Sequence, residues 1–164
     1  MKLAFRAGYL ACVSAIALGA FIAPSSATTV VNVSLWDKGT ETEMPKGLAL
    51  GQDGNMKMAP LGVKIDRETV QAGKVIFRVT NNSKDMVHEM LVASVSDPKH
   101  PLPYVAKDDR VDEGAAHDLG EVSELDPGKT GELSLDLSPG TYVLFCNVPS
   151  HMEAGMWALL TVKK

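Results

Sequence analysis

Cysteine is scarce in this sequence, whose 164 residues include only Cys12 and Cys146. Cys12 lies in an N-terminal segment that we expect to be removed, so the mature chain keeps one thiol and folds without a disulfide. Basic residues are in the minority, with 16 Lys and Arg against 20 Asp and Glu. An acidic chain argues against nucleic acid and against an anionic membrane surface as partners. Beyond residues 7–23, no apolar run is long enough to span a membrane.

The N-terminal 27 residues have the pattern of a secretory signal peptide. Lys2 and Arg6 precede an apolar run, and the small residues Ser25 and Ala27 suit a cleavage site before Thr28. Two alternatives are a lipoprotein signal with Cys12 as the lipidated residue and an uncleaved anchor over residues 7–23. We expect cleavage, export to the periplasm and no stable membrane insertion afterwards. Residues 28–164 then form a single domain, which we expect to be monomeric.

Apolar and polar residues alternate with a period of two along the mature chain, which indicates β-strands. Gly, Pro and Asn turns separate the alternating runs, so the pattern predicts an all-β sandwich or barrel of about seven to eight strands. The expected strands are residues 29–36, 62–66, 74–80, 86–94, 130–137, 141–147 and 156–162.

Two segments depart from this alternation. Residues 37–60 are rich in Gly, Pro and Met, and we expect a loop. Residues 97–126 contain nine acidic and three basic residues, and we expect an irregular acidic excursion with a short helix near residues 105–116. The simplest interpretation of this excursion is a solvated surface loop.

Potential metal ligands gather near the C-terminus in the pattern Cys146-x4-His151-x4-Met156. Pro149 ends the preceding strand and Gly155 permits a turn, so the three side chains return to one end of a sheet. Thiolate, imidazole and thioether are ligands for copper, whereas zinc sites seldom use methionine. The alternative is a buried free cysteine beside a surface histidine and a core methionine, which would be the better interpretation for any one of these residues alone.

A fourth ligand has to come from His88, His100 or His117. His88 shares a strand face with Met90 and Val92, where an imidazole that is neither hydrogen-bonded nor ligated would be costly to bury. His100 and His117 are better interpreted as solvated loop residues. His88 is therefore the predicted fourth ligand.

Asn81-Asn82 before His88, and Gly140-Thr141-Tyr142 before the Cys146, His151 and Met156 motif, resemble the cupredoxins, the small blue copper proteins of the plastocyanin and azurin type. The four-residue spacings are closer to those of rusticyanin and auracyanin, and Glu89 stands where plastocyanin and azurin carry an asparagine. The resemblance implies a Greek-key β-sandwich with a type 1 copper site. His88, Cys146 and His151 would form a trigonal ligand set, with Met156 as a weak axial ligand.

This resemblance implies a one-electron carrier that docks a redox protein, such as a cytochrome or an oxidase, near the edge of His151. An apolar collar of Val148, Pro149, Met152 and Ala154 would surround that edge. The sequence lacks the second ligand cysteine of a binuclear copper site and the extra histidines of a multicopper oxidase, so we do not expect an enzyme. The alternative function is copper handling, for tolerance, storage or delivery, because soft thioethers select Cu(I). Six further methionines are available for it: Met44, Met56, Met58, Met86, Met90 and Met152.

Overall fold

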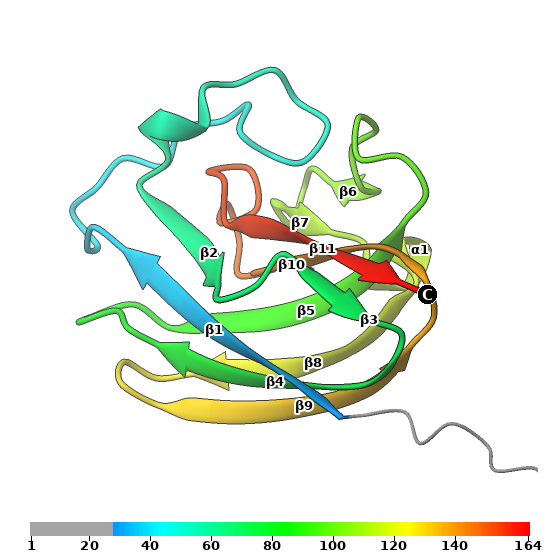
Figure 1. The fold of residues 1–164 in the computed structure, drawn as a ribbon. Helices are drawn as coiled ribbons and strands as arrows, with labels where there is room; N and C mark the ends of the chain where they lie inside the picture. Colours follow the sequence, from blue (N-terminus) through cyan, green and yellow to red (C-terminus); the bar gives the residue numbers. More distant parts are fainter. Residues whose placement is uncertain (1–27) are drawn as a thin grey trace, which may run out of the picture.

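The fold is a sandwich of two β-sheets, seen in a computed structural model that describes residues 28–164 (Figure 1). The predicted signal peptide lies outside the described residues. The first sheet has the strand order β2-β1-β4-β9. Its strands are β2 (Leu61–Ile65), β1 (Thr29–Asp37), β4 (Gly73–Asn81) and β9 (Thr130–Leu137).

The second sheet has the order β3-β11-β10-β5-β8 and carries the candidate site. Its strands are β3 (Thr69–Gln71), β11 (Trp157–Lys163), β10 (Gly140–Phe145), β5 (His88–Val95) and β8 (Asp118–Leu125). A separate two-stranded hairpin pairs β6 (Tyr104–Val105) with β7 (Arg110–Val111). Helical structure in the described residues is limited to the 3₁₀ turn η1 (Met56–Met58) and the short helix α1 (Glu113–Ala116), and no helix of this part is long and apolar enough to cross a membrane.

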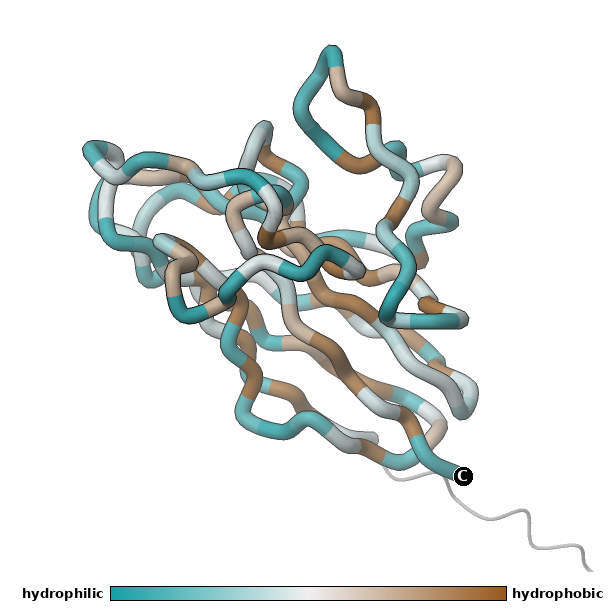
Figure 2. The backbone as a smooth tube through the Cα atoms, turned by 90° about the horizontal axis from the view of Figure 1, so that it is seen from above, coloured by the Kyte–Doolittle hydropathy of each residue, from teal (hydrophilic) through white to brown (hydrophobic). Residues whose placement is uncertain are grey.

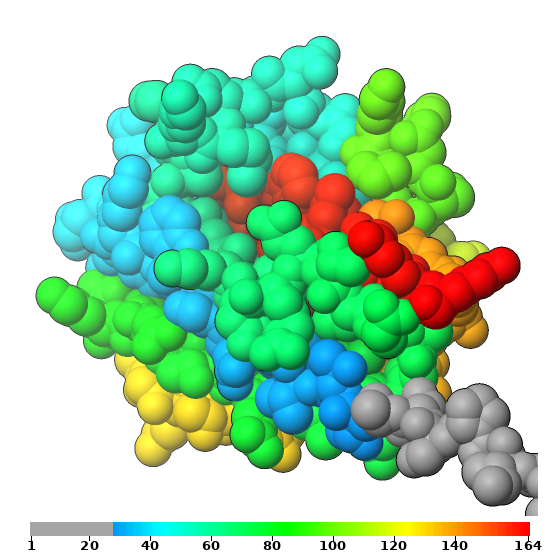
Figure 3. All heavy atoms as spheres, in the orientation of Figure 1, coloured from blue at the N-terminus to red at the C-terminus, as the bar shows by residue number. Residues whose placement is uncertain are grey.

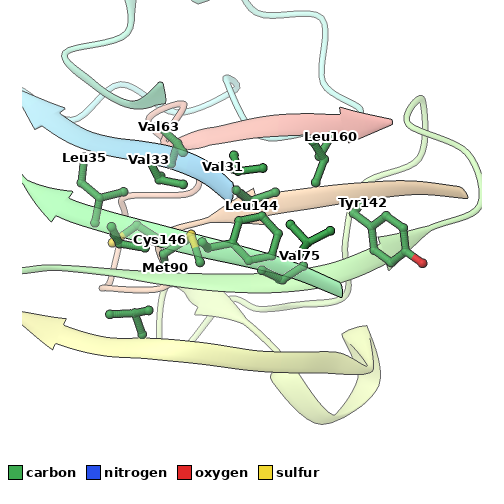
Figure 4. Close-up of a cluster of buried hydrophobic side chains, with 14 of the residues drawn as sticks. Val31, Val33, Leu35, Val63, Val75, Met90, Tyr142, Leu144, Cys146 and Leu160 are labelled. Carbon is green, nitrogen blue, oxygen red and sulfur yellow. The ribbon is translucent and has the colours of Figure 1, made fainter. Parts of the chain in front are cut away.

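The all-β prediction is confirmed, and its alternating faces lie where expected. Hydrophobic residues concentrate on the central strands, while the peripheral loops are mainly hydrophilic (Figure 2). The inward faces of both sheets form one core between the layers, which includes Val31, Phe77, Leu144 and Cys146. In Figure 4, Cys146 lies near the end of this core that holds Leu35, and Tyr142 lies at the opposite end.

The prediction of an irregular acidic excursion over residues 97–126 is wrong for its second half. Residues 118–125 form the edge strand β8, which pairs with β5 through Met90↔Val122 and Leu91↔Glu121. Val122 is the one buried residue of β8, so the strand lacks the repeated apolar alternation by which the other strands were predicted. The expected helix near residues 105–116 is reduced to α1, capped by the Asp112 carboxylate, which accepts from Ala115 N–H at 3.0 Å.

The second sheet has a further cover of its own outside the sandwich. A second hydrophobic cluster lies on its outer face and includes Leu50, Leu91, Val111, Phe145 and Met152. The loop at 38–60 and the segment around β6, β7 and α1 contribute to this cluster. Both faces of β5 and β10 are therefore buried near the candidate site, which explains the unbroken burial of residues 88–93.

Candidate metal centre

Three side chains predicted as ligands converge at one end of the second sheet. His88 begins β5, Cys146 follows the end of β10, and His151 lies on the loop between β10 and β11. The Sγ atom of Cys146 lies 3.4 Å from His151 Nδ1 and 4.0 Å from His88 Nδ1, and the two Nδ1 atoms are 3.3 Å apart. In the described part of the chain, this trio is the group of His, Cys, Asp and Glu side chains that is close enough to hold a metal ion.

Main-chain hydrogen bonds close the loop from Cys146 to Met156. The N–H of Cys146 donates to the carbonyl of Met156 at 3.1 Å, and the N–H of Met156 donates to the carbonyl of His151 at 3.0 Å. Gly155, at a φ of +100°, provides the turn that the sequence predicts there. The loop is therefore fixed by its own backbone, and the imidazole of His151 is held beside the thiol.

Met156 is fully buried and belongs to the same core cluster as Cys146. Its carbonyl accepts from Cys146 N–H, so the backbone of Met156 lies beside that of Cys146. His100 and His117 lie elsewhere and are exposed, with His100 bonded to Asp97 at 3.0 Å and His117 ending α1. The expectation that these two histidines are loop residues is confirmed.

Burial dominates the protonation of the three donors. It raises the pKa of the Cys146 thiol to about 12, although N–H groups of Glu89 and Val148 point at the sulfur and act in the opposite direction. Burial, followed by the nearby charge of His88, lowers the pKa of His151 to about 4. Burial also lowers the pKa of His88. Both imidazoles are thus neutral at pH 7 and able to bind a metal. The thiol is deprotonated only when a strong Lewis acid, such as a metal ion, binds its sulfur.

Asp37 is a residue of this site that the sequence reasoning missed. Its Oδ2 lies 2.8 Å from His88 Nε2, and the two side chains are 3% and 0% exposed. Burial raises the pKa of Asp37, but hydrogen bonds from Ser83, His88 and Gly39 outweigh it and lower the pKa below the ordinary value. The missed signal was periodicity, because Val31, Val33 and Leu35 point inward and Asp37 continues their alternation.

The turn before His88 is built on Asn81, which is completely buried. Its amide group donates to the carbonyls of Met86 at 2.9 Å and Leu125 at 2.7 Å, and its Oδ1 accepts from Ser83 N–H at 2.9 Å. The Ser83 hydroxyl oxygen in turn accepts from Met86 N–H at 2.8 Å. This polar turn fixes the backbone entering β5 and so the position of His88.

Glu89 occupies the position where the sequence resemblance placed an asparagine. Its N–H approaches Cys146 Sγ at 3.5 Å, and the residue is 9% exposed. Burial, and then the charges of Glu121, Glu113 and Glu124, raise the pKa of Glu89 to about 7. A link between the site and the outer hairpin is made instead by Asn147, whose side-chain amide accepts from Val111 N–H at 2.7 Å and donates to Val111 C=O at 3.0 Å.

The loop at 38–60 covers the metal-binding end of the molecule (Figures 1 and 3). Leu48 N–H donates to the Glu153 carbonyl at 3.0 Å, and the Trp157 indole N–H donates to the Leu48 carbonyl at 2.8 Å. His151 is consequently only 4% exposed. The predicted apolar collar is wrong for Met152 and Ala154, which are both buried. Met152 packs in the outer cluster with Ala49 and Leu50 of this loop, and Ala154 belongs to the core between the sheets. Val148 and Pro149 keep access to solvent.

Comparison with known proteins agrees with this geometry. Residues 46–163 match the family described as copper binding proteins, plastocyanin/azurin family. A sulfocyanin of Sulfolobus acidocaldarius is 26% identical over 94 residues, which are 56% of this chain and 47% of that protein, so the chain spans about half the length of this relative.

Two solved structures share the fold. Auracyanin of Roseiflexus castenholzii has a TM-score of 0.50 at 19% identity, with coverage of 85% of this chain and 100% of that one. Rusticyanin of Thiobacillus ferrooxidans has a TM-score of 0.51 at 17% identity, with coverage of 85% and 79%.

The site and the fold are those of a small copper-binding β-sandwich. The chain belongs to the plastocyanin/azurin family of copper-binding proteins, the cupredoxins, and its cofactor is a copper ion. The donor set fits that ion, because one sulfur and two imidazole nitrogens are buried within 4.8 Å of one another.

Proposed function

We propose that this protein is an exported one-electron carrier, whose copper ion is held by His88, Cys146 and His151 with Met156 as a weak additional ligand. The observation that carries this proposal is the clustered donor set. Three donor atoms lie within 4.8 Å of one another on buried side chains. A metal held by such a rigid site changes its surroundings little between its two oxidation states, which favours fast electron exchange.

Copper, when bound, supplies a couple that takes up and returns one electron. The protein keeps water away from it, because His88, Cys146 and Met156 are fully buried and His151 nearly so. The N–H groups of Glu89 and Val148 point at Cys146 Sγ and stabilise the thiolate. A sulfur that is ligated and buried is also protected from oxidation, which an unpaired cysteine needs in an oxidising compartment. A closed, dry donor set of this kind supports a carrier rather than an enzyme.

The partner of this carrier would be a redox protein, such as a cytochrome or an oxidase, that docks over the metal-binding end. His151 is the ligand with residual exposure, and Val148, Pro149, Met56 and Met58 provide apolar surface around that end. Acidic residues on the exposed face of β8 and in the preceding segment would steer a basic partner at low salt. Residues 1–27 would act as the cleaved signal peptide, and residues 28–164 as a monomeric periplasmic domain.

The first experiment concerns the thiolate. The mature protein with one equivalent of Cu(II) should show an intense visible band from thiolate-to-copper charge transfer. Cys146→Ser should abolish the band while circular dichroism still shows a folded β-sandwich. His100→Gln is the matched control, because His100 is exposed and outside the trio, and it should keep the band. A band of unchanged intensity in Cys146→Ser would contradict the proposed ligand set.

A second candidate function is copper handling, and one observation favours it. Met56 and Met58, on η1, are 41% and 68% exposed. This turn belongs to the loop at 38–60, which covers the loop from Cys146 to Met156. Exposed thioethers at this place suit capture or release of Cu(I). The two functions differ in what the protein does with its metal, since a carrier retains copper and a delivery protein transfers it.

The deciding measurement compares two rates in the same reduced protein. One is electron exchange with a small cytochrome, and the other is Cu(I) loss to a chelator or to a copper acceptor. We expect fast electron exchange that slows with salt, and slow copper loss. The double variant Met56→Leu, Met58→Leu keeps the apolar surface and removes both sulfurs, and it should change neither rate much. Rapid copper loss that this variant abolishes, with sluggish electron exchange, would establish copper handling instead.

A further inference from the structure

The feature that the proposed function does not yet use is the buried carboxylate behind His88. Asp37 ends β1 in the opposite sheet, and its Oδ2 lies 2.8 Å from His88 Nε2. Its second oxygen accepts from Gly39 N–H at 2.7 Å. Ser83, Gly39 and the imidazole thus all donate to this carboxylate, and 3% of its side chain is exposed.

We propose that Asp37 is an anionic positioning residue that fixes the His88 imidazole for metal binding and lowers the reduction potential of the bound copper. The inference rests on the proposed role of His88 as a ligand.

The tautomer of His88 follows from the partner on Nε2. A carboxylate only accepts hydrogen bonds, so Nε2 must carry the proton and donate a hydrogen bond to Asp37. Nδ1 then has a free lone pair, and this is the nitrogen that faces Cys146 Sγ and His151 Nδ1. The same bond sets the orientation of the ring, as partners of metal-binding histidines generally do. The ligand atom is therefore available before copper arrives.

The charge of the carboxylate has a separate effect. The negative charge lies one imidazole ring away from the proposed metal position, with no solvent layer between them, because both side chains are buried. Low local polarity leaves such a charge weakly screened. A nearby anion stabilises Cu(II) more than Cu(I), so it opposes reduction. A neutral acceptor in the same place would fix the ring equally well and would not supply this effect.

The first arm of the test uses the mature, copper-loaded protein and the variant Asp37→Asn, which has nearly the same shape and no charge. We expect the variant to keep its copper and its visible band. Its equilibrium constant for reduction should rise by at least about tenfold, which for one electron is ~59 mV. Asp85→Asn is the matched control, because Asp85 is an exposed carboxylate beside Gly39 and Thr40. The control should change the constant by less than about twofold. A constant in Asp37→Asn that matches the control would overturn the proposed charge effect.

The second arm needs neither the variant nor the metal. Long-range ¹H–¹⁵N NMR of the copper-free wild-type protein reports which ring nitrogen of His88 carries the proton. Protonation at Nε2 is expected, and protonation at Nδ1 would overturn the positioning role even if Asp37→Asn fails to fold. Failure of the proposed function is distinguishable, because it would appear as a wild-type protein without the visible band, whatever the tautomer of His88.

Discussion

Two buried groups beside the metal centre should respond to acid in opposite directions. His151 has a pKa lowered to about 4, and Glu89 has a pKa raised to about 7. Between pH 6.5 and pH 4 the unfolded chain binds a proton at His151 that the folded protein excludes, so the free energy of unfolding falls as pH falls. The folded protein binds a proton at Glu89 before the unfolded chain does, so this group raises the free energy of unfolding over the same window.

The magnitudes follow from the pKa values. For His151, a change from an ordinary 6.5 to about 4 removes about 2 kcal/mol of unfolding free energy between pH 7 and pH 4.5. For Glu89, a change from 4.5 to about 7 adds about 2–3 kcal/mol over the same interval. In the copper-free wild-type protein the two contributions nearly cancel, and the remaining pH dependence comes from other groups.

Single substitutions should therefore separate the two pH-dependent contributions, which nearly cancel in the wild-type protein. Urea unfolding of the copper-free protein, followed by tryptophan fluorescence at pH 7 and pH 4.5, measures the effect. From pH 7 to pH 4.5, the free energy of unfolding of His151→Gln should rise by about 2 kcal/mol relative to that of wild type. The free energy of unfolding of Glu89→Gln should fall by about 2–3 kcal/mol relative to that of wild type over the same interval. His100→Gln, on an exposed histidine, should follow wild type. If both buried-site variants follow wild type as well, the pKa shifts assigned to burial are refuted.

Two further predictions concern the ligand loop. Met156→Gln should keep copper bound but lower the reduction potential, because an amide oxygen favours Cu(II) more than a thioether does. Cyclic voltammetry measures this potential. An unchanged potential would show that Met156 is a core residue, and Met152 would then be the next sulfur to test. Gly155→Ala should lower the free energy of unfolding by about 1–3 kcal/mol, because residue 155 has a φ of +100° and the new methyl would lie 3.0 Å from Ala59 Cβ. The control is Gly128→Ala, where φ is also positive but the space around the new methyl is open. A larger loss of unfolding free energy in the control would show that crowding plays no part.

The sequence was sufficient to select three side chains that the fold brings together and to place most strands of the sandwich. His88, Cys146 and His151 were found because imidazole, thiolate and thioether groups at strand ends together indicate copper, and the structure brings the three residues together. Strands with repeated inward apolar residues, such as β4 and β9, lie close to their predicted bounds. Periodicity and donor chemistry are both local properties, and a single sequence displays them.

Features that depend on partners distant in the chain were not predicted. β8 was missed because its burial comes from pairing with β5 and not from its own alternation. Asp37 was missed because its role depends on His88, which is 51 residues away. The buried state of Met152 depends on the loop at 38–60, whose composition indicated a loop but not the surface that it covers.

The register between β5 and β10 has a consequence for how this protein can be monitored. Phe145 pairs with Leu91 and Leu144 pairs with Val92, which sets Cys146 and His88 on the same inward face. A slip of one residue in this ladder would turn every side chain of one strand to the other face. The thiol would then point into the outer cluster, away from both imidazoles. The colour of the copper-loaded protein therefore reports strand alignment at the centre of the sheet, so that a preparation can be checked for correct pairing by its visible absorption.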